Sequence, residues 1–287
     1  MNQQGKNILL RLLAKPVVLC FAGFLVSFFV ALLLFFPLDP LARQIEQAAL
    51  EQKVQLEIGS ISTSLPPGVK LGQLILSTPE MADHALKIDQ IAFQPRWLSL
   101  FGKNPAIAYQ LRAYQGSGQG QGARNGQVSL QLKGLRVQES LQPQLPLELS
   151  FLLKDADFAG RLPFVGQNKG QVQMTLAEIQ LTGMQKLGSS SDLLALGQAR
   201  LSAEAVGPLI RITAVSVAGP SLSLQGSGSL RLGRTPASSS LNLGLTLTPG
   251  AGLDPMLKDL LSLMKKPQRD GSYRITISGN LAGLRMK

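Results

Sequence analysis

The chain has 287 residues, with 28 Lys and Arg against 17 Asp and Glu, so its formal net charge is +11. It contains one Cys and one His, which excludes an intrachain disulfide and a zinc site of the usual kind. The positive charge favours an anionic partner surface, either lipid or acidic protein. Nucleic acid is not an expected partner, because no recognised motif or basic helix accompanies the charge.

An uninterrupted apolar segment, residues 17–36, predicts a transmembrane helix. It reads VVLCFAGFLVSFFVALLLFF, and twenty residues without a charge match the length of one bilayer-spanning helix. No small-residue cleavage pattern follows, which favours an uncleaved anchor over a signal peptide. Lys6, Arg11 and Lys15 precede the segment, so the positive-inside rule leaves residues 1–16 in the cytoplasm. In a Gram-negative bacterium this describes a single-pass inner-membrane protein with a periplasmic C-terminal domain.

Two short amphipathic helices are predicted beyond the membrane segment. The first is a juxtamembrane helix over residues 37–53, where Asp39 can act as the N-cap and Pro40 can occupy the first helical position. The same start recurs at Leu253-Asp254-Pro255, and the apolar spacing that follows predicts a second helix over residues 254–266.

The remaining sequence, residues 54–287, predicts a periplasmic β domain of about eleven to thirteen strands. Its segments alternate apolar and polar residues, as at Leu222, Leu224, Leu230 and Leu232, which share one parity. The fold class is therefore mainly β: a transmembrane helix, then a curved, mostly antiparallel multi-stranded sheet, partly open or rolled, with the two helices. Such strands have one apolar face that something must cover: this chain, a partner protein or lipid.

Several strands change the parity of their apolar residues midway. Since a one-residue slip turns side chains to the other face, we expect β-bulges or sharp bends near residues 89–90, 177–178 and 213–214. Bulged strands curve, which predicts a strongly twisted or coiled sheet. Residues 115–127, QGSGQGQGARNGQ, are rich in Gly and Gln and predict a flexible loop or a weak edge strand.

No catalytic, cofactor-binding or metal-binding residue emerges from the sequence. His84 lies in a loop-like stretch without the partners of a catalytic triad, and Cys20 lies within the apolar segment. Asp155 and Asp157 lack the spacing of a calcium loop and are interpreted as part of a polar turn. We therefore expect no cofactor and no enzyme, and no ligand-binding residues are assigned.

Three sequence segments occur in an order that can be compared with known protein families. Residues 64–76 read SLPPGVKLGQLIL, residues 91–105 read IAFQPRWLSLFGKNP, and the chain closes with YRITISGNL at residues 273–281. Together with the anchor, they resemble the type II secretion system protein N family in its anchored, periplasmic-sheet form. They also resemble, more loosely, the AsmA-like group of envelope proteins. The likeness covers most of the chain but consists of strand patterns and turns, so it implies no site residues.

The two resemblances imply two functions. The first implies an accessory inner-membrane component of the type II secretion system, whose periplasmic β platform contacts other secretion proteins. The second implies an envelope protein that binds or carries lipid in a hydrophobic β groove.

Overall fold

A computed structural model describes residues 24, 27, 38–51, 55–64, 68–77, 85–100, 102–140, 146–233, 235, 238–264 and 266–286. The chain divides into two compact units, Met1–Leu86 and Lys87–Lys287. We call them the N-terminal and C-terminal units and describe each by itself.

Among the described residues of the N-terminal unit, one helix and one hairpin have defined bounds. Helix α3 (Leu38–Glu51) is followed by β1 (Gln55–Ser64) and β2 (Gly68–Ser77), which pair antiparallel. The backbone N–H of Ile58 donates to Glu46 Oε1 over 3.3 Å, so the helix contacts the hairpin. Helix α3 matches the predicted juxtamembrane helix, although it begins one residue before Asp39.

Residues 17–36, the predicted transmembrane helix, lie outside the described residues except for Phe24 and Ser27. Within the described part of the chain, no helix combines the length and the apolar character that crossing a bilayer requires. Cys20 and His84 also lie outside the described residues.

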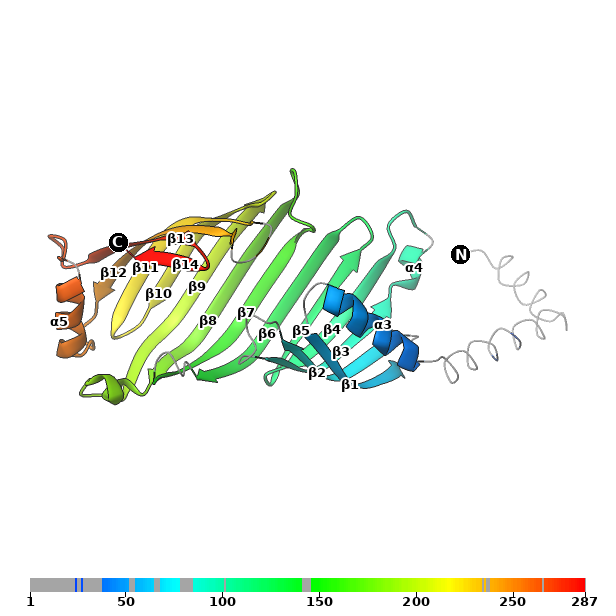
Figure 1. The fold of residues 1–287 in the computed structure, drawn as a ribbon, viewed down its shortest axis with the longest axis horizontal. Helices are drawn as coiled ribbons and strands as arrows, with labels where there is room; N and C mark the ends of the chain where they lie inside the picture. Colours follow the sequence, from blue (N-terminus) through cyan, green and yellow to red (C-terminus); the bar gives the residue numbers. More distant parts are fainter. Residues whose placement is uncertain are drawn as a thin grey trace, which may run out of the picture. The chain divides into compact units, whose positions relative to one another are not determined.

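The C-terminal unit is an antiparallel meander, in which each strand pairs with the next one along the chain (Figure 1). A mainly β fold with an antiparallel sheet is thereby confirmed. Its first half comprises β3 (Leu86–Pro95), the short helix α4 (Trp97–Leu100), β4 (Ala106–Ala113), β5 (Gly116–Ala123), β6 (Gln127–Ser140), β7 (Glu148–Arg161), β8 (Lys169–Thr182) and η2 (Met184–Leu187). Its second half comprises β9 (Leu193–Val206), β10 (Leu209–Ala218), β11 (Leu222–Arg231), β12 (Ser240–Pro249), α5 (Pro255–Met264), β13 (Tyr273–Asn280) and β14 (Gly283–Met286).

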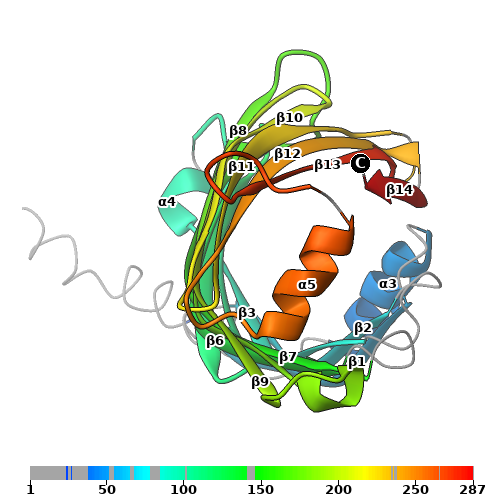
Figure 2. The same cartoon turned by 90° about the vertical axis from the view of Figure 1, so that its left-hand side faces the viewer.

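The strands of this unit bend, so that its sheet has a concave and a convex face, with α5 on the concave side (Figure 2). Two predicted bulges are confirmed, because the β8–β9 register shifts between Leu176 and Ile179 and the β9–β10 register shifts between Ile212 and Ala214. The β3–β4 register over residues 90–95 contains no shift, and a bulge at residues 89–90 stays a prediction. Each confirmed bulge returns the apolar residues that follow it to the concave face.

The prediction of a flexible loop or an edge strand for residues 115–127 is wrong for most of this segment, residues 116–123. These residues form β5, which pairs with β4 on one side and β6 on the other. Its glycines make room for neighbouring side chains: a Cβ at Gly118 would lie 2.6 Å from Leu132 Cδ2 and 2.8 Å from Leu111 Cγ. The Tyr109 ring crosses Gly120, and its hydroxyl donates to the Ser129 carbonyl over 2.7 Å. Large residues on both flanking strands thus cover a strand whose one apolar side chain is Ala123, at its end.

This packing predicts a position-dependent cost for adding one methyl group to β5. A Cβ at Gly120 would lie 2.2 Å from the Ser129 carbonyl oxygen and 2.5 Å from Tyr109 Cζ, whereas a Cβ at Gly122 meets nothing within 4 Å. We expect Gly120→Ala to lower the free energy of unfolding by about 2 kcal/mol, as overpacking does. Gly122→Ala, on the same strand and face, is the matched control and should change it by less than about 0.5 kcal/mol. Urea denaturation of both variants measures the difference, and equal values would contradict the packing.

Candidate functional site

The sheet of the C-terminal unit segregates apolar and polar residues between its two faces. Since paired residues in antiparallel strands share a face, the register identifies them. One row across the concave face reads Tyr109, Gly120, Leu130, Phe158, Val172, Ala203, Ile212, Gly228, Leu243 and Ile277. The adjacent row on the convex face reads Ala108, Gln121, Ser129, Ala159, Gln171, Glu204, Arg211, Ser229, Asn242 and Ser278.

Burial on the concave face is uneven along the strands. We call the strand ends that join through residues 114–115, 183–192 and 250–272 the α5 side. Toward that side lie five large buried residues: Leu135, Leu153, Ile179, Leu247 and Tyr273. Their neighbours Leu176, Val217 and Leu224 are half-buried. Toward the other ends, the large apolar residues of the same face are only half-buried: Leu130, Phe158, Val172, Ile210, Ile212, Leu230, Leu241, Leu243 and Ile277. We call this second set the open half; it is an aliphatic surface with no charged residue.

Helix α5 lies on the concave face near Tyr273, a residue that is 3% exposed. The Oγ of Ser262 and the Oη of Tyr273 are 2.9 Å apart and share a hydrogen bond. Leu257 and Leu261 of α5 are half-buried, whereas Lys258 and Asp259 are exposed, as the sequence predicts for an amphipathic helix. The helix therefore covers part of the apolar face, at one end only.

A single carboxylate joins α5 to the loop after β8. Asp254 caps the helix, because its Oδ1 accepts from the Met256 N–H over 2.9 Å. Its Oδ2 accepts from the Ser189 hydroxyl over 3.0 Å, from the Ser190 N–H over 2.9 Å, and from the Ser190 hydroxyl. The hydrogen bonds from Ser190, hydroxyl first and then backbone N–H, lower the pKa of Asp254 to about 2. We call this arrangement the Asp254 latch.

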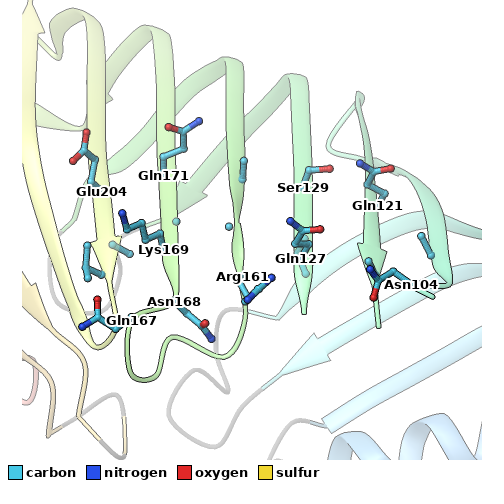
Figure 3. Close-up of a pocket in the computed structure, with 18 of the residues that line it drawn as sticks. Asn104, Gln121, Gln127, Ser129, Arg161, Gln167, Asn168, Lys169, Gln171 and Glu204 are labelled. Carbon is cyan, nitrogen blue, oxygen red and sulfur yellow. The ribbon is translucent and has the colours of Figure 1, made fainter. Parts of the chain in front are cut away.

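The convex face carries a polar furrow across β4–β9, formed by three hollows of about 1050, 630 and 330 Å³. Figure 3 shows the largest, into which Gln121, Ser129 and Gln171 project from three strands. The first two hollows share these residues, and the second and third share Gln110, Gln119 and Gln131. Arg96 Nη1 donates to Gln121 Oε1 over 2.6 Å, and Gln119 Nε2 donates to Gln131 Oε1 over 3.1 Å. Amides and cations of this kind suit polar or anionic groups rather than apolar ones.

The other residues considered in the sequence analysis form no catalytic or metal site among the described residues. Asp155 and Asp157 lie within β7, opposite Lys133 and Gln131 on the convex face, so their interpretation as a polar turn is wrong. Among the described residues, no group of three or more His, Cys, Asp and Glu could hold a metal ion.

Comparison of the chain with protein-family models, with curated proteins and with solved structures finds no match.

The Asp254 latch predicts that α5 is held most firmly when this carboxyl is ionised. Its pKa lies below the ordinary 3.8, so the stabilisation is present above about pH 4 and is lost as the pH falls toward 2. We expect Asp254→Asn to lower the urea midpoint at neutral pH, and the gap between the two proteins to close over that acidic range. Asp259→Asn, an exposed carboxylate on the same helix, is the control. A gap that is independent of pH would contradict the assignment.

Proposed function

We propose that the protein is a non-catalytic envelope component that binds the acyl chains of lipids on its concave face. The observation that carries the proposal is the open half, where aliphatic side chains of successive strands are half-exposed along one face. Exposed apolar area costs roughly 25 cal/mol per Å² relative to buried area, and monomeric proteins rarely leave a continuous apolar surface uncovered.

The chemistry of the open half favours an acyl chain over a folded partner. Its lining is Leu, Ile and Val, with Phe158 as its one large aromatic residue. Protein interface cores are instead enriched in Tyr, Trp, Met and Arg. A flexible chain of methylene groups can follow a long, shallow aliphatic surface that offers no polar partner. The predicted inner-membrane anchor, with the sheet in the periplasm, would place this face beside a source of such chains.

Cross-linking tests the proposal through two adjacent residues on opposite faces. Leu201 pairs with Met174 on the concave face, and its neighbour Arg200 pairs with Thr175 on the convex face. We expect a photoreactive residue at position 201 of the full chain, activated in cells, to give lipid adducts detectable by mass spectrometry. The same residue at position 200 should give none, or at least tenfold fewer. Equal yields at both positions, or none at 201, would reject lipid binding at this face.

We further propose that this component works with the type II secretion system, as the sequence resemblance implies. A structural feature that favours a protein partner is the last strand of the meander, β14. It pairs with β13 only at residues 277–280, and its four residues are exposed. The edge formed by β14 and by residues 273–276 of β13 could accept an extended strand, with main-chain hydrogen bonds supplying the affinity.

A pulldown of the tagged full chain from detergent-solubilised membranes tests this second proposal. We expect secretion components to co-purify, and Leu284→Lys to weaken their recovery, because a cation on an edge strand opposes strand addition. Leu193→Lys is the control, since Leu193 and Leu284 are both 46% exposed and Leu193 lies in a strand that is paired on both sides. Recovery of no secretion component, together with normal secretion by a deletion strain, would reject the proposal.

A further inference from the structure

Opposite the α5 side, the strands of the C-terminal unit are joined by a second series of connections. These connections span residues 96–105, 124–126, 162–168, 207–208, 232–239 and 281–282. We call their described residues, all except 101, 234, 236 and 237, the loop rim; most of it follows the upper edge of the sheet in Figure 1. Backbone hydrogen bonds link each connection to the next: Arg124 N to Pro105 O, Leu162 N to Gly126 O, Gly207 N to Asn168 O, Leu232 N to Pro208 O, and Leu281 N to Ser239 O. At a strand spacing of about 4.8 Å, the rim extends roughly 50 Å.

The loop rim is basic along its N-terminal half. Arg96, Lys103 and Arg124 lie in its connections, and Arg161 and Lys169 flank the third one. No Asp or Glu occurs in any of the six connections, whereas the connections on the α5 side contain Asp192, Asp254, Asp259 and Asp270. Three of the cations, Arg96, Arg161 and Lys169, also line the largest of the three hollows of the convex face. Figure 3 shows Arg161 and Lys169 at the strand ends.

Apolar side chains project from the same connections into solvent. Leu98 is 92% exposed, Val165 59% and Trp97 41%. Leu162 and Leu281 are also exposed, and the third, fourth and fifth connections surround an apolar hollow lined by Phe164, Pro208 and Leu232. In the N-terminal half of the rim these residues lie between the cations, rather than forming one patch.

This combination points to a lipid bilayer. Separate apolar tips between cations suit a fluid surface, because each tip can insert on its own while the cations contact headgroups. A Trp at the rim suits the same boundary, where its ring prefers the level of the headgroups. An acidic protein would satisfy the cations, but it would have to supply a separate pocket for each of several scattered tips.

We propose that the loop rim docks on the surface of an anionic lipid bilayer. The open half of the concave face borders this rim, so docking would bring the half-exposed aliphatic residues next to the acyl chains of that bilayer. This consequence rests on the proposed lipid function, whereas the docking itself rests only on the charges and exposed tips of the rim.

Trp97 provides a direct test, because it is the only Trp in the chain and lies on the rim. The full chain is reconstituted into vesicles whose phospholipids carry brominated acyl chains, which quench Trp fluorescence on contact. One set contains phosphatidylcholine alone, and the other contains equal parts of phosphatidylcholine and phosphatidylglycerol. We expect strong quenching in the anionic vesicles only, and its loss as the salt concentration rises.

Two rim variants and two matched controls distinguish a loss of docking from a loss of folding. Neutralising Arg124, Arg161 and Lys169 to Gln should reduce the docked-to-undocked ratio about fivefold per cation. The combined Leu98→Asp and Val165→Asp variant should also abolish quenching. Neutralising three exposed cations on the α5 side, Lys186, Lys258 and Lys266, should leave it unchanged, as should Leu263→Asp on α5, where the side chain is 88% exposed.

The outcomes distinguish this inference from the proposed function. Equal quenching in both vesicle types, or equal loss in rim variants and controls, would overturn docking; capture of an acidic protein without quenching would do the same. Lipid adducts at position 201 report acyl-chain binding independently. Quenching without adducts would support docking and reject acyl-chain binding on the concave face. Adducts without quenching would support acyl-chain binding and reject docking.

Discussion

The alternation of apolar and polar residues along antiparallel strands is the constraint on which the C-terminal unit depends. Because paired residues share a face, every strand adds its apolar residues to the concave side, and the bulges after Leu176 and Ile212 keep them there. An apolar face of this kind is stable only when something covers it. The chain itself buries five large residues toward α5, whereas the large apolar residues of the open half are only half-buried, so the functional question reduces to what covers the open half.

A single curved sheet must also be stable without a second layer packed over its whole length. The meander helps, since each strand pairs with the next one along the chain, so that most contacts form between neighbouring segments of the sequence. Strand β5 illustrates the local solution. Its glycines are covered by side chains of the two neighbouring strands, Tyr109 and Leu111 on one side and Leu132 on the other. These side chains occupy the space that a second sheet would otherwise fill.

Much of this fold could be predicted from the sequence, because a period of two and its interruptions are local signals. The parity changes near residues 178 and 213 locate two bulges, and Asp254 before Pro255 locates a helix start. The strand β5 could not be recognised from apolar periodicity, since glycine carries no side chain to show which face it occupies. Its alternation of Gly116, Gly118 and Gly120 with Ser and Gln was the available signal. The partners of Asp254 lie 64 and 65 residues away, which no local pattern reveals.

The same meander explains how the two sides of the sheet can differ in their acidic residues. Every second connection lies on the same side, so substitutions in alternate loops change one side without altering the other or the strands between them. Along the sequence, strands and the loops of the α5 side separate the basic residues of the loop rim from one another. The charge pattern of the sequence therefore does not show which residues lie on the same side of the sheet. When the connections are sorted by side, Arg96, Lys103 and Arg124 lie on a rim without acids. The α5 side instead mixes Asp192, Asp254 and Asp270 with cations such as Lys186 and Lys258. The resulting polarity runs along the strands: α5 covers part of the apolar face at one end, and the rim without acidic residues lies at the other.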